Sequence, residues 1–292
     1  MAVPFFEVTS VRPTAASSYR AEIDESWNLR PLPQGGVVTA IALRAMEAAL
    51  ADPTQELRTL HTTFVSQVAH GVVDVEVELL RRGRSMSHLR AEVRNPASER
   101  GHITTAVFGG PRRGFEFTDL APPADLPPPS ECPSFRSPPP PEVKLAFSPM
   151  PFWEQRVEGR AALGHAAWED YVPDRAERAF WYRFDDPPLL PNGAIDPLSY
   201  VVLVDTMPGA VGEKMGPQHR EWFAPSIDLT VHLLGEARSP WLLAHNQARW
   251  AGEGYASGDM SLWDCGVEGT AAPRLVAYAT QLFCFSFPPA RA

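Results

Sequence analysis

A proline-rich segment in the middle of the chain limits the folds that are open to it. Eleven prolines fall between Pro111 and Pro141, in a run that includes APPADLPPPSECPSFRSPPPP. Proline fixes φ and lacks a backbone N–H, so this segment can form neither a regular helix nor a central strand. We predict an extended linker over 111–149, an N-terminal domain over 1–110 and a C-terminal domain over 150–292. Binding of the proline run to a partner in polyproline II form is the alternative.

The two parts that flank the linker show the same order of patterns. Each has an apolar helix pattern, preceded by strand patterns and followed by four strand patterns. In the first part the helix spans 31–50, and the strands span 17–29, 57–68, 71–83, 84–95 and 101–110. In the second part the helix spans 196–211, and the strands span 153–159, 177–184, 225–235, 241–250, 254–264 and 274–287.

Both predicted helices are apolar nearly all round, so each is expected to be buried on all sides. A sheet that wraps around one central helix would bury it, and strands in series favour antiparallel neighbours. We therefore predict an α+β fold with an internal duplication, in which two antiparallel sheets are each wrapped around a central helix. Pairing of the two sheets edge to edge would protect edge strands that otherwise invite aggregation.

Composition excludes several classes of function. The chain has 292 residues, a net charge of −9 and 44% hydrophobic residues, as expected for a globular protein with a large core. Binding to nucleic acid needs clustered Lys and Arg, which this acidic chain does not favour. Its three cysteines lie far apart without a CxxC pair, so we predict no metal site, no cofactor and a cytoplasmic setting. No apolar run reaches membrane-spanning length, so no membrane span is expected.

The stretch PSIDLTVHLLG, residues 225–235, alternates strictly between apolar and polar side chains. Its apolar set predicts one buried strand face, and the opposite face begins with Asp228. An ionised carboxylate accepts hydrogen bonds and can orient a water molecule or act as a base. A solvated strand face is the alternative. Gln281 lies on an apolar face of the last strand pattern, where its amide must find hydrogen-bond partners.

Taken in order, five segments resemble the type II acyl-CoA thioesterase family, in which two hot-dog domains lie in one chain. These segments are QGGVVTAIALRAM, LHTTF, LLRRGRSMSHLRAEV, SIDLTVHLL and RLVAYATQLFCF. The resemblance implies hydrolysis of acyl-CoA thioesters in lipid metabolism, with Asp228 and Gln281 activating a water molecule. The family's third catalytic position, a Ser or Thr, falls within HNQARW, where Gln247 or Arg249 stands instead.

The resemblance also suggests residues that bind the acyl-CoA substrate. Gly35 and Gly36 open the first helix, where free N–H groups could approach a carbonyl oxygen or a phosphate. His61 follows that helix on a strand that could line the pocket, and Arg84 could pair with the phosphates of coenzyme A. Two alternatives remain: a non-catalytic acyl-CoA-binding protein, and a hydratase or dehydratase of acyl thioesters. The sheets would also allow a homo-oligomer.

Overall fold

The computed structural model describes residues 3–138, 140–141, 150–166, 169–217 and 222–288. Its main feature is one sheet of twelve strands, in which every pair of neighbours is antiparallel. The strands are β1 (Arg12–Ala15), β2 (Ser18–Ile23), β3 (Glu56–Phe64), β4 (Gly71–Arg81), β5 (Met86–Arg94), β6 (His102–Gly109), β7 (Val157–Leu163), β8 (Glu177–Phe184), β9 (Asp228–Leu233), β10 (Leu242–Gly252), β11 (Tyr255–Asp264) and β12 (Arg274–Cys284).

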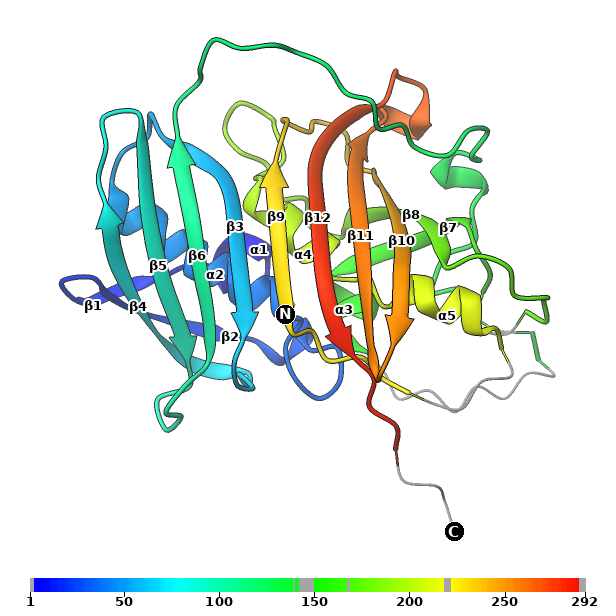
Figure 1. Ribbon diagram of the computed structural model, residues 1–292, viewed down its shortest axis with the longest axis horizontal. Helices are drawn as coiled ribbons and strands as arrows, with labels where there is room; N and C mark the ends of the chain where they lie inside the picture. Colours follow the sequence, from blue (N-terminus) through cyan, green and yellow to red (C-terminus); the bar gives the residue numbers. More distant parts are fainter. Residues whose placement is uncertain (1–2, 139, 142–149, 167–168, 218–221, 289–292) are drawn as a thin grey trace.

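Two buried helices lie side by side against one face of the sheet (Figure 1). They are α2 (Gly35–Leu50) and α4 (Leu198–Val204), and every residue of α4 is buried. The remaining helices are α1 (Phe5–Val8), α3 (Pro151–Gln155) and α5 (Gly209–Met215). The apolar helix patterns therefore give the buried helices expected of the double hot-dog fold. Among the described residues, no helix combines the length and apolar character that crossing a bilayer requires.

The predicted edge-to-edge pairing of the two halves is confirmed at β3 and β9. The strand order is β1-β2-β4-β5-β6-β3-β9-β12-β11-β10-β8-β7, so β3 and β9 join the strands of the first part to those of the second. His61 lies opposite Thr230 in this pair, and Thr63 lies opposite Asp228. The predicted alternation in β9 is confirmed too, because Leu229, Val231 and Leu233 are buried.

The structure corrects three of the predicted elements. The helix predicted over 196–211 is two helices, α4 and α5. Thr206 Oγ1 donates to the Leu203 carbonyl at 2.8 Å, and Pro208 follows two residues later. The helical hydrogen-bond pattern of α4 therefore ends before α5 begins. The strand predicted over 153–159 begins as helix α3 and becomes β7 only at Val157. The strand predicted over 17–29 ends at Ile23 and continues as a 3₁₀ turn over Glu25–Trp27.

The segment after β6 runs across the sheet and reaches β7 at its far edge (Figure 1). Residues 110–128 form no helix or strand, and a 3₁₀ turn follows over Pro129–Glu131. The Phe135 N–H donates to the Gly159 carbonyl at 2.8 Å, and the Ala161 N–H donates to the Pro133 carbonyl at 3.1 Å. This segment therefore covers the exposed edge of β7, as edge protection requires. Residue 139 and residues 142–149 of the predicted linker lie outside the described residues.

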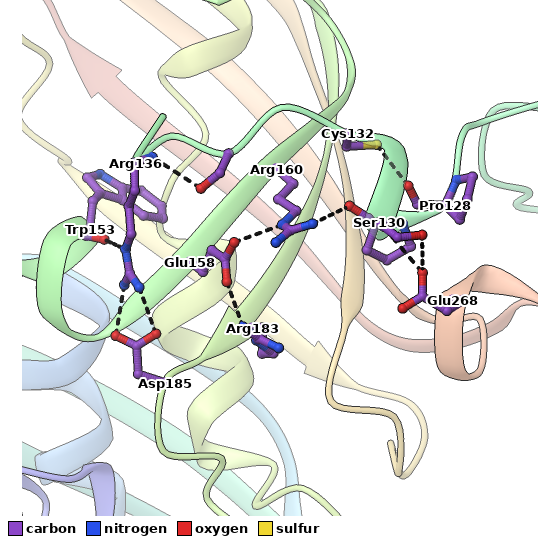
Figure 2. Close-up of polar contacts among 12 residues, drawn as sticks. Pro128, Ser130, Cys132, Arg136, Trp153, Glu158, Arg160, Arg183, Asp185 and Glu268 are labelled. Atoms are coloured by element: carbon purple, nitrogen blue, oxygen red, sulfur yellow. Dashed lines mark hydrogen bonds and ion pairs between the residues drawn. The ribbon is translucent and has the colours of Figure 1, made fainter. Parts of the chain in front are cut away.

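Charged side chains hold this segment against β7 and β8, as Figure 2 shows. The Arg136 guanidinium donates to both carboxylate oxygens of Asp185, at 2.9 and 2.8 Å, and its Nε donates to the Trp153 carbonyl at 2.8 Å. Arg160 donates to the Pro129 carbonyl at 2.8 Å and to Glu158 at 2.8 Å. The segment is thus anchored at its 3₁₀ turn, through Pro129, and again after the turn, through Arg136.

Candidate active site

A buried carboxylate, Asp205, lies where the C-terminal end of α4 meets the N-terminal end of α2. Its Oδ2 accepts hydrogen bonds from the Gly36 N–H at 2.8 Å and from Gln34 Nε2 at 3.0 Å. Its Oδ1 accepts hydrogen bonds from Gln281 Nε2 at 2.5 Å and from Ser226 Oγ at 3.2 Å. These donors come from the start of α2, from the residues just before β9, and from β12. Side chains far apart in the sequence therefore converge on one carboxylate.

The environment of Asp205 favours its neutral form. Burial raises the pKa of Asp205 from 3.8 to about 6, although hydrogen bonds from Gln281, Gly36 and Ser226 oppose that rise. The salt bridges of the described residues do not include Asp205, so its charge is balanced by uncharged donors alone. A carboxyl group with a pKa near neutrality can take up a proton and return it at physiological pH.

The glycine pair at the start of α2 lets Asp205 approach the helix. A Cβ atom at Gly35 would lie 2.7 Å from Asp205 Oδ2 and 2.8 Å from Phe64 Cε1. A Cβ atom at Gly36 would lie 2.5 Å from the Val201 carbonyl oxygen, in the neighbouring helix. Larger residues would therefore push α4 and the carboxylate away from the positive end of α2, where an anion is stabilised.

Gln281 connects the carboxylate to the hydroxyl of Ser226. Its Nε2 donates to Ser226 Oγ at 2.9 Å as well as to Asp205, and the residue is 2% exposed. Its Oε1 is buried and has no hydrogen-bond partner among the residues that the structure describes. Buried amide oxygens are normally satisfied, so this acceptor marks a position where a polar group such as water would be bound.

A second contact between the two central helices, at the N-terminal end of α4, has different chemistry. At the N-terminal end of α4, the Leu198 N–H donates to Asp196 Oδ1 at 3.0 Å, so this helix is capped by its own preceding acid. The group that α2 brings to this contact is Arg44, which forms ion pairs with Asp196 and Glu47. A cavity of about 550 Å³ adjoins these three side chains. The acid at the start of α4 is therefore paired with a guanidinium, which stays protonated, whereas Asp205 at the start of α2 is held by uncharged donors.

Asp228, predicted to share a water molecule with Gln281, lies on the other face of the sheet. Its Oδ1 accepts a hydrogen bond from the Leu282 N–H at 2.8 Å, which ties β9 to β12. Asp228 alternates with the buried Leu229, whereas Gln281 points inward with Ala279 and contacts Asp205. The structure therefore pairs Gln281 with a different carboxylate from the one that the sequence suggested.

Gln247 and Arg249, the two residues considered for the third position, also lie away from Asp205. The Gln247 amide donates to Glu177 at 2.8 Å, next to β8. The Arg249 guanidinium donates to Asp259 at 2.5 Å and is exposed. Arg249 and Asp228 both line a pocket of about 290 Å³ at the sheet surface. A hydroxyl does lie beside Asp205, that of Ser226.

The four predicted substrate-binding residues divide into two groups. Gly35 and Gly36 lie at the Asp205 contact, where the Gly36 N–H already donates to the carboxylate. His61 is exposed on the sheet and lies 2.9 Å from Thr230 Oγ1. Arg84 is exposed in the turn after β4, and the neighbouring Arg82 donates to the carbonyl at the C-terminal end of α2. Since α2 has 16 residues, about 24 Å of helix separates that end from Gly35.

Sequence reasoning missed Asp205, Ser226 and Gln34. Asp205 has a recognisable signal, because it is the single charged residue in the apolar stretch LSYVVLVDTM. A lone acid in such a stretch is buried only when it is paired or hydrogen-bonded, and functional acids are typical cases. Ser226 falls at the start of the predicted strand over 225–235 and Gln34 at the start of the predicted helix over 31–50, where polar residues are common.

Comparison with known proteins agrees with this architecture. Residues 23–109 match the family model of the acyl-CoA thioesterase N-terminal domain, and residues 129–285 match that of its C-terminal domain. No curated protein sequence matches the chain.

Solved structures with the same fold cover nearly the whole chain. A conserved protein of unknown function with a hot-dog fold from Alicyclobacillus acidocaldarius is 23% identical, with 98% of each chain covered and a TM-score of 0.75. The acyl-CoA thioesterase II TesB2 of Mycobacterium marinum is 22% identical, with 98% of this chain and 100% of that chain covered and a TM-score of 0.71. The tesB protein of Mycobacterium avium subspecies paratuberculosis is 18% identical, with 98% of each chain covered and a TM-score of 0.69. At these identities the likeness shows the fold, and the family matches over both parts of the sequence show that the chain belongs to the acyl-CoA thioesterase family.

Proposed function

We propose that the protein hydrolyses acyl-CoA thioesters, with Asp205 as the general base toward a bound water molecule. The observation that carries this proposal is the convergence of Gln281 and Ser226 on a buried carboxylate whose pKa is raised to about 6. The orphan Oε1 of Gln281 supports a water site beside the carboxylate. A water molecule there would donate one hydrogen bond to Gln281 Oε1 and the other to Asp205 Oδ1.

Besides the thioester and water, the reaction needs a proton acceptor and no further reactant. Asp205 takes a proton from water as the water oxygen forms a bond to the thioester carbonyl carbon. The tetrahedral intermediate then collapses, the carbon–sulfur bond breaks, and the coenzyme A thiolate takes up the proton from Asp205. The products are the free acid and the free thiol of coenzyme A. Ser226 and Gln281 hold the water in line with the carbonyl, and general-base catalysis of this kind contributes about 10²- to 10⁴-fold to rates.

The position of α2 explains why one carboxylate is suited to this role. The Gly36 N–H and the positive end of the helix stabilise ionised Asp205, while burial stabilises its protonated form. These opposing effects keep the group ready to gain and lose a proton near neutral pH. At the N-terminal end of α4, the acid Asp196 is held in an ion pair with Arg44, so we propose one catalytic centre per chain, at Asp205.

Release of free thiol from acyl-CoAs of increasing chain length tests the proposal. The wild type should release thiol from at least one chain length, and Asp205→Asn should lower kcat/KM by about 100-fold or more. Asp228→Asn is the matched control, since it makes the same substitution on the other face of the sheet, and it should stay within about twofold of the wild type.

Three results would overturn the proposal. Absence of thiol release, together with thermal stabilisation by acyl-CoA, would indicate a binding protein. A change in ultraviolet absorbance with enoyl-CoA and no thiol release would indicate a hydratase. Loss of activity in Asp228→Asn but not in Asp205→Asn would assign the base to the outer face of the sheet.

A further inference from the structure

Gln34 links the two central helices through a fully buried side chain. It is 0% exposed, and its Oε1 accepts a hydrogen bond from the Val37 N–H at 3.0 Å, which caps the start of α2. Its Nε2 lies 3.0 Å from each of three oxygens: the carbonyls of Val202 and Asp205 and the carboxylate Oδ2 of Asp205. One amide therefore caps α2 and binds the end of α4 at the same time.

Gln34 does more than cap α2, because three acceptor oxygens surround its amide nitrogen. A primary amide nitrogen carries two protons, yet three oxygens of α4 and its end lie within hydrogen-bond distance of Gln34 Nε2. Two of them are carbonyls at a helix C-terminus, which lack partners within the helix. The third is a carboxylate oxygen, which forms a stronger bond when ionised. The Gln34 amide thus contacts both the main-chain carbonyl and the side-chain carboxylate of Asp205.

We propose that Gln34 is a positioning residue for the proposed hydrolysis, on which this inference rests, and that it holds Asp205 Oδ2 toward α2 so that Oδ1 faces Ser226 and Gln281. The other donors that α2 brings to Asp205 are the backbone N–H groups of Gly36, at 2.8 Å from Oδ2, and of Gly35. The groups that face Asp205 are otherwise uncharged donors from α2, from the segment before β9 and from β12. Gln34 adds a side-chain donor to these backbone groups, and together they fix which carboxylate oxygen meets the water.

A cap alone and a positioning role predict different behaviour for Gln34→Glu. The glutamate keeps an oxygen that can accept the Val37 N–H, so a residue that only caps α2 would leave the reaction unchanged. In the positioning role, the second glutamate oxygen replaces the donor beside Asp205 Oδ2 and creates two carboxylates at hydrogen-bond distance. Such a pair holds one proton tightly, so the acid limb of kcat/KM should move up by about two pH units. At pH 7, kcat should fall about tenfold, with KM within about threefold of the wild type.

Gln34→Asn gives a second variant that keeps an excellent capping residue but shortens the side chain by one methylene. Its amide should no longer span the gap to Asp205, so kcat should fall while the melting temperature changes little. Gln55→Glu is the matched control, because Gln55 is 6% exposed and its Nε2 donates to Asp52 at 2.9 Å and to the Gly83 carbonyl at 3.1 Å. It repeats the same substitution beside another acid, beyond the opposite end of α2, and should leave the kinetics unchanged.

A measurement besides activity separates this inference from the proposed function. In protein labelled with [¹³C]aspartate, the Asp205 carboxyl signal can be assigned by its loss in Asp205→Asn and followed against pH. A titration midpoint that rises in Gln34→Glu, but not in Gln55→Glu, together with the lower kcat, supports the role of Gln34. An unshifted midpoint with an active wild type overturns the role of Gln34 alone. Absence of thiol release by the wild type overturns the proposed hydrolysis itself.

Discussion

Asp205 should impose a measurable pH dependence on the stability of the fold. Its pKa is raised to about 6 in the protein, against 3.8 as the ordinary value, because the carboxyl group is buried. The folded protein therefore binds this proton more tightly than the unfolded chain does. The contribution of Asp205 to the free energy of unfolding is then largest below about pH 4, declines as the pH rises toward 6, and is level above that.

The size of this effect follows from the shift in pKa. A shift of about two units corresponds to about 3 kcal/mol in total, of which about 2.4 kcal/mol falls between pH 4 and pH 7. Asp205→Asn removes the titration and leaves other groups to contribute equally to both proteins. The difference in unfolding free energy between wild type and variant should therefore change by that amount across the interval.

Urea unfolding at half-unit steps from pH 4 to pH 7.5 measures this difference directly. The expected result is a wild type that loses stability relative to Asp205→Asn as the pH rises, with the midpoint of the change at about pH 5 and little further change above about pH 6. Asp228→Asn should follow the wild-type curve, because its carboxylate lies on the outer face of the sheet and binds the Leu282 N–H. Parallel curves for wild type and Asp205→Asn would refute the claim that burial raises the pKa of this group.

Three further substitutions have expected outcomes. Gly35→Ala should lower kcat in the thiol-release assay by about tenfold or more, because the new Cβ would lie 2.7 Å from Asp205 Oδ2. Gly114→Ala is the control: a Cβ there would have no atom within 4 Å, so kcat should match that of the wild type. Ser226→Ala should lower kcat by about tenfold, because it removes a hydroxyl that contacts Asp205 and Gln281. Ser226→Thr keeps a hydroxyl and should retain most of the wild-type kcat. Equal rates for the two variants would contradict the role of the hydroxyl. Arg136→Met removes a half-exposed ion pair with Asp185, so it should lower the free energy of unfolding in urea by about 1 kcal/mol or less and leave kcat unchanged. A lower kcat would mean that the linker segment acts on the site.

The fold could be predicted because its determinants are local. Helix α2 begins at the predicted Gly pair, since Gly35 and Gly36 allow close approach of α4. The strands were predicted because apolar and polar residues alternate, as in Leu229 and Val231 of β9. The break between α4 and α5 was missed because the apolar pattern continues through it, while Thr206 and Pro208 stop the backbone ladder.

The candidate site was harder to predict because it depends on contacts between distant segments. Gln281 was recognised, since a polar amide on an apolar strand face must have partners. Its partner could not be identified, because no sequence pattern shows whether Asp228 or Asp205 contacts Gln281. The choice depends on which face each carboxylate meets, and α4 brings Asp205 to the buried face. Gln34 and Ser226 acquire their meaning only from that tertiary contact.

The pH dependence of kcat/KM for an acyl-CoA substrate tests most directly whether Asp205 is the base. The predicted profile rises with pH and levels off, with the midpoint of its acid limb at about 6, because Asp205 must be ionised to accept a proton from water. The residual activity of Asp205→Asn should lack that limb, while Asp228→Asn should keep it. A wild-type profile that is flat through pH 6, or a limb that persists in Asp205→Asn, would contradict the account.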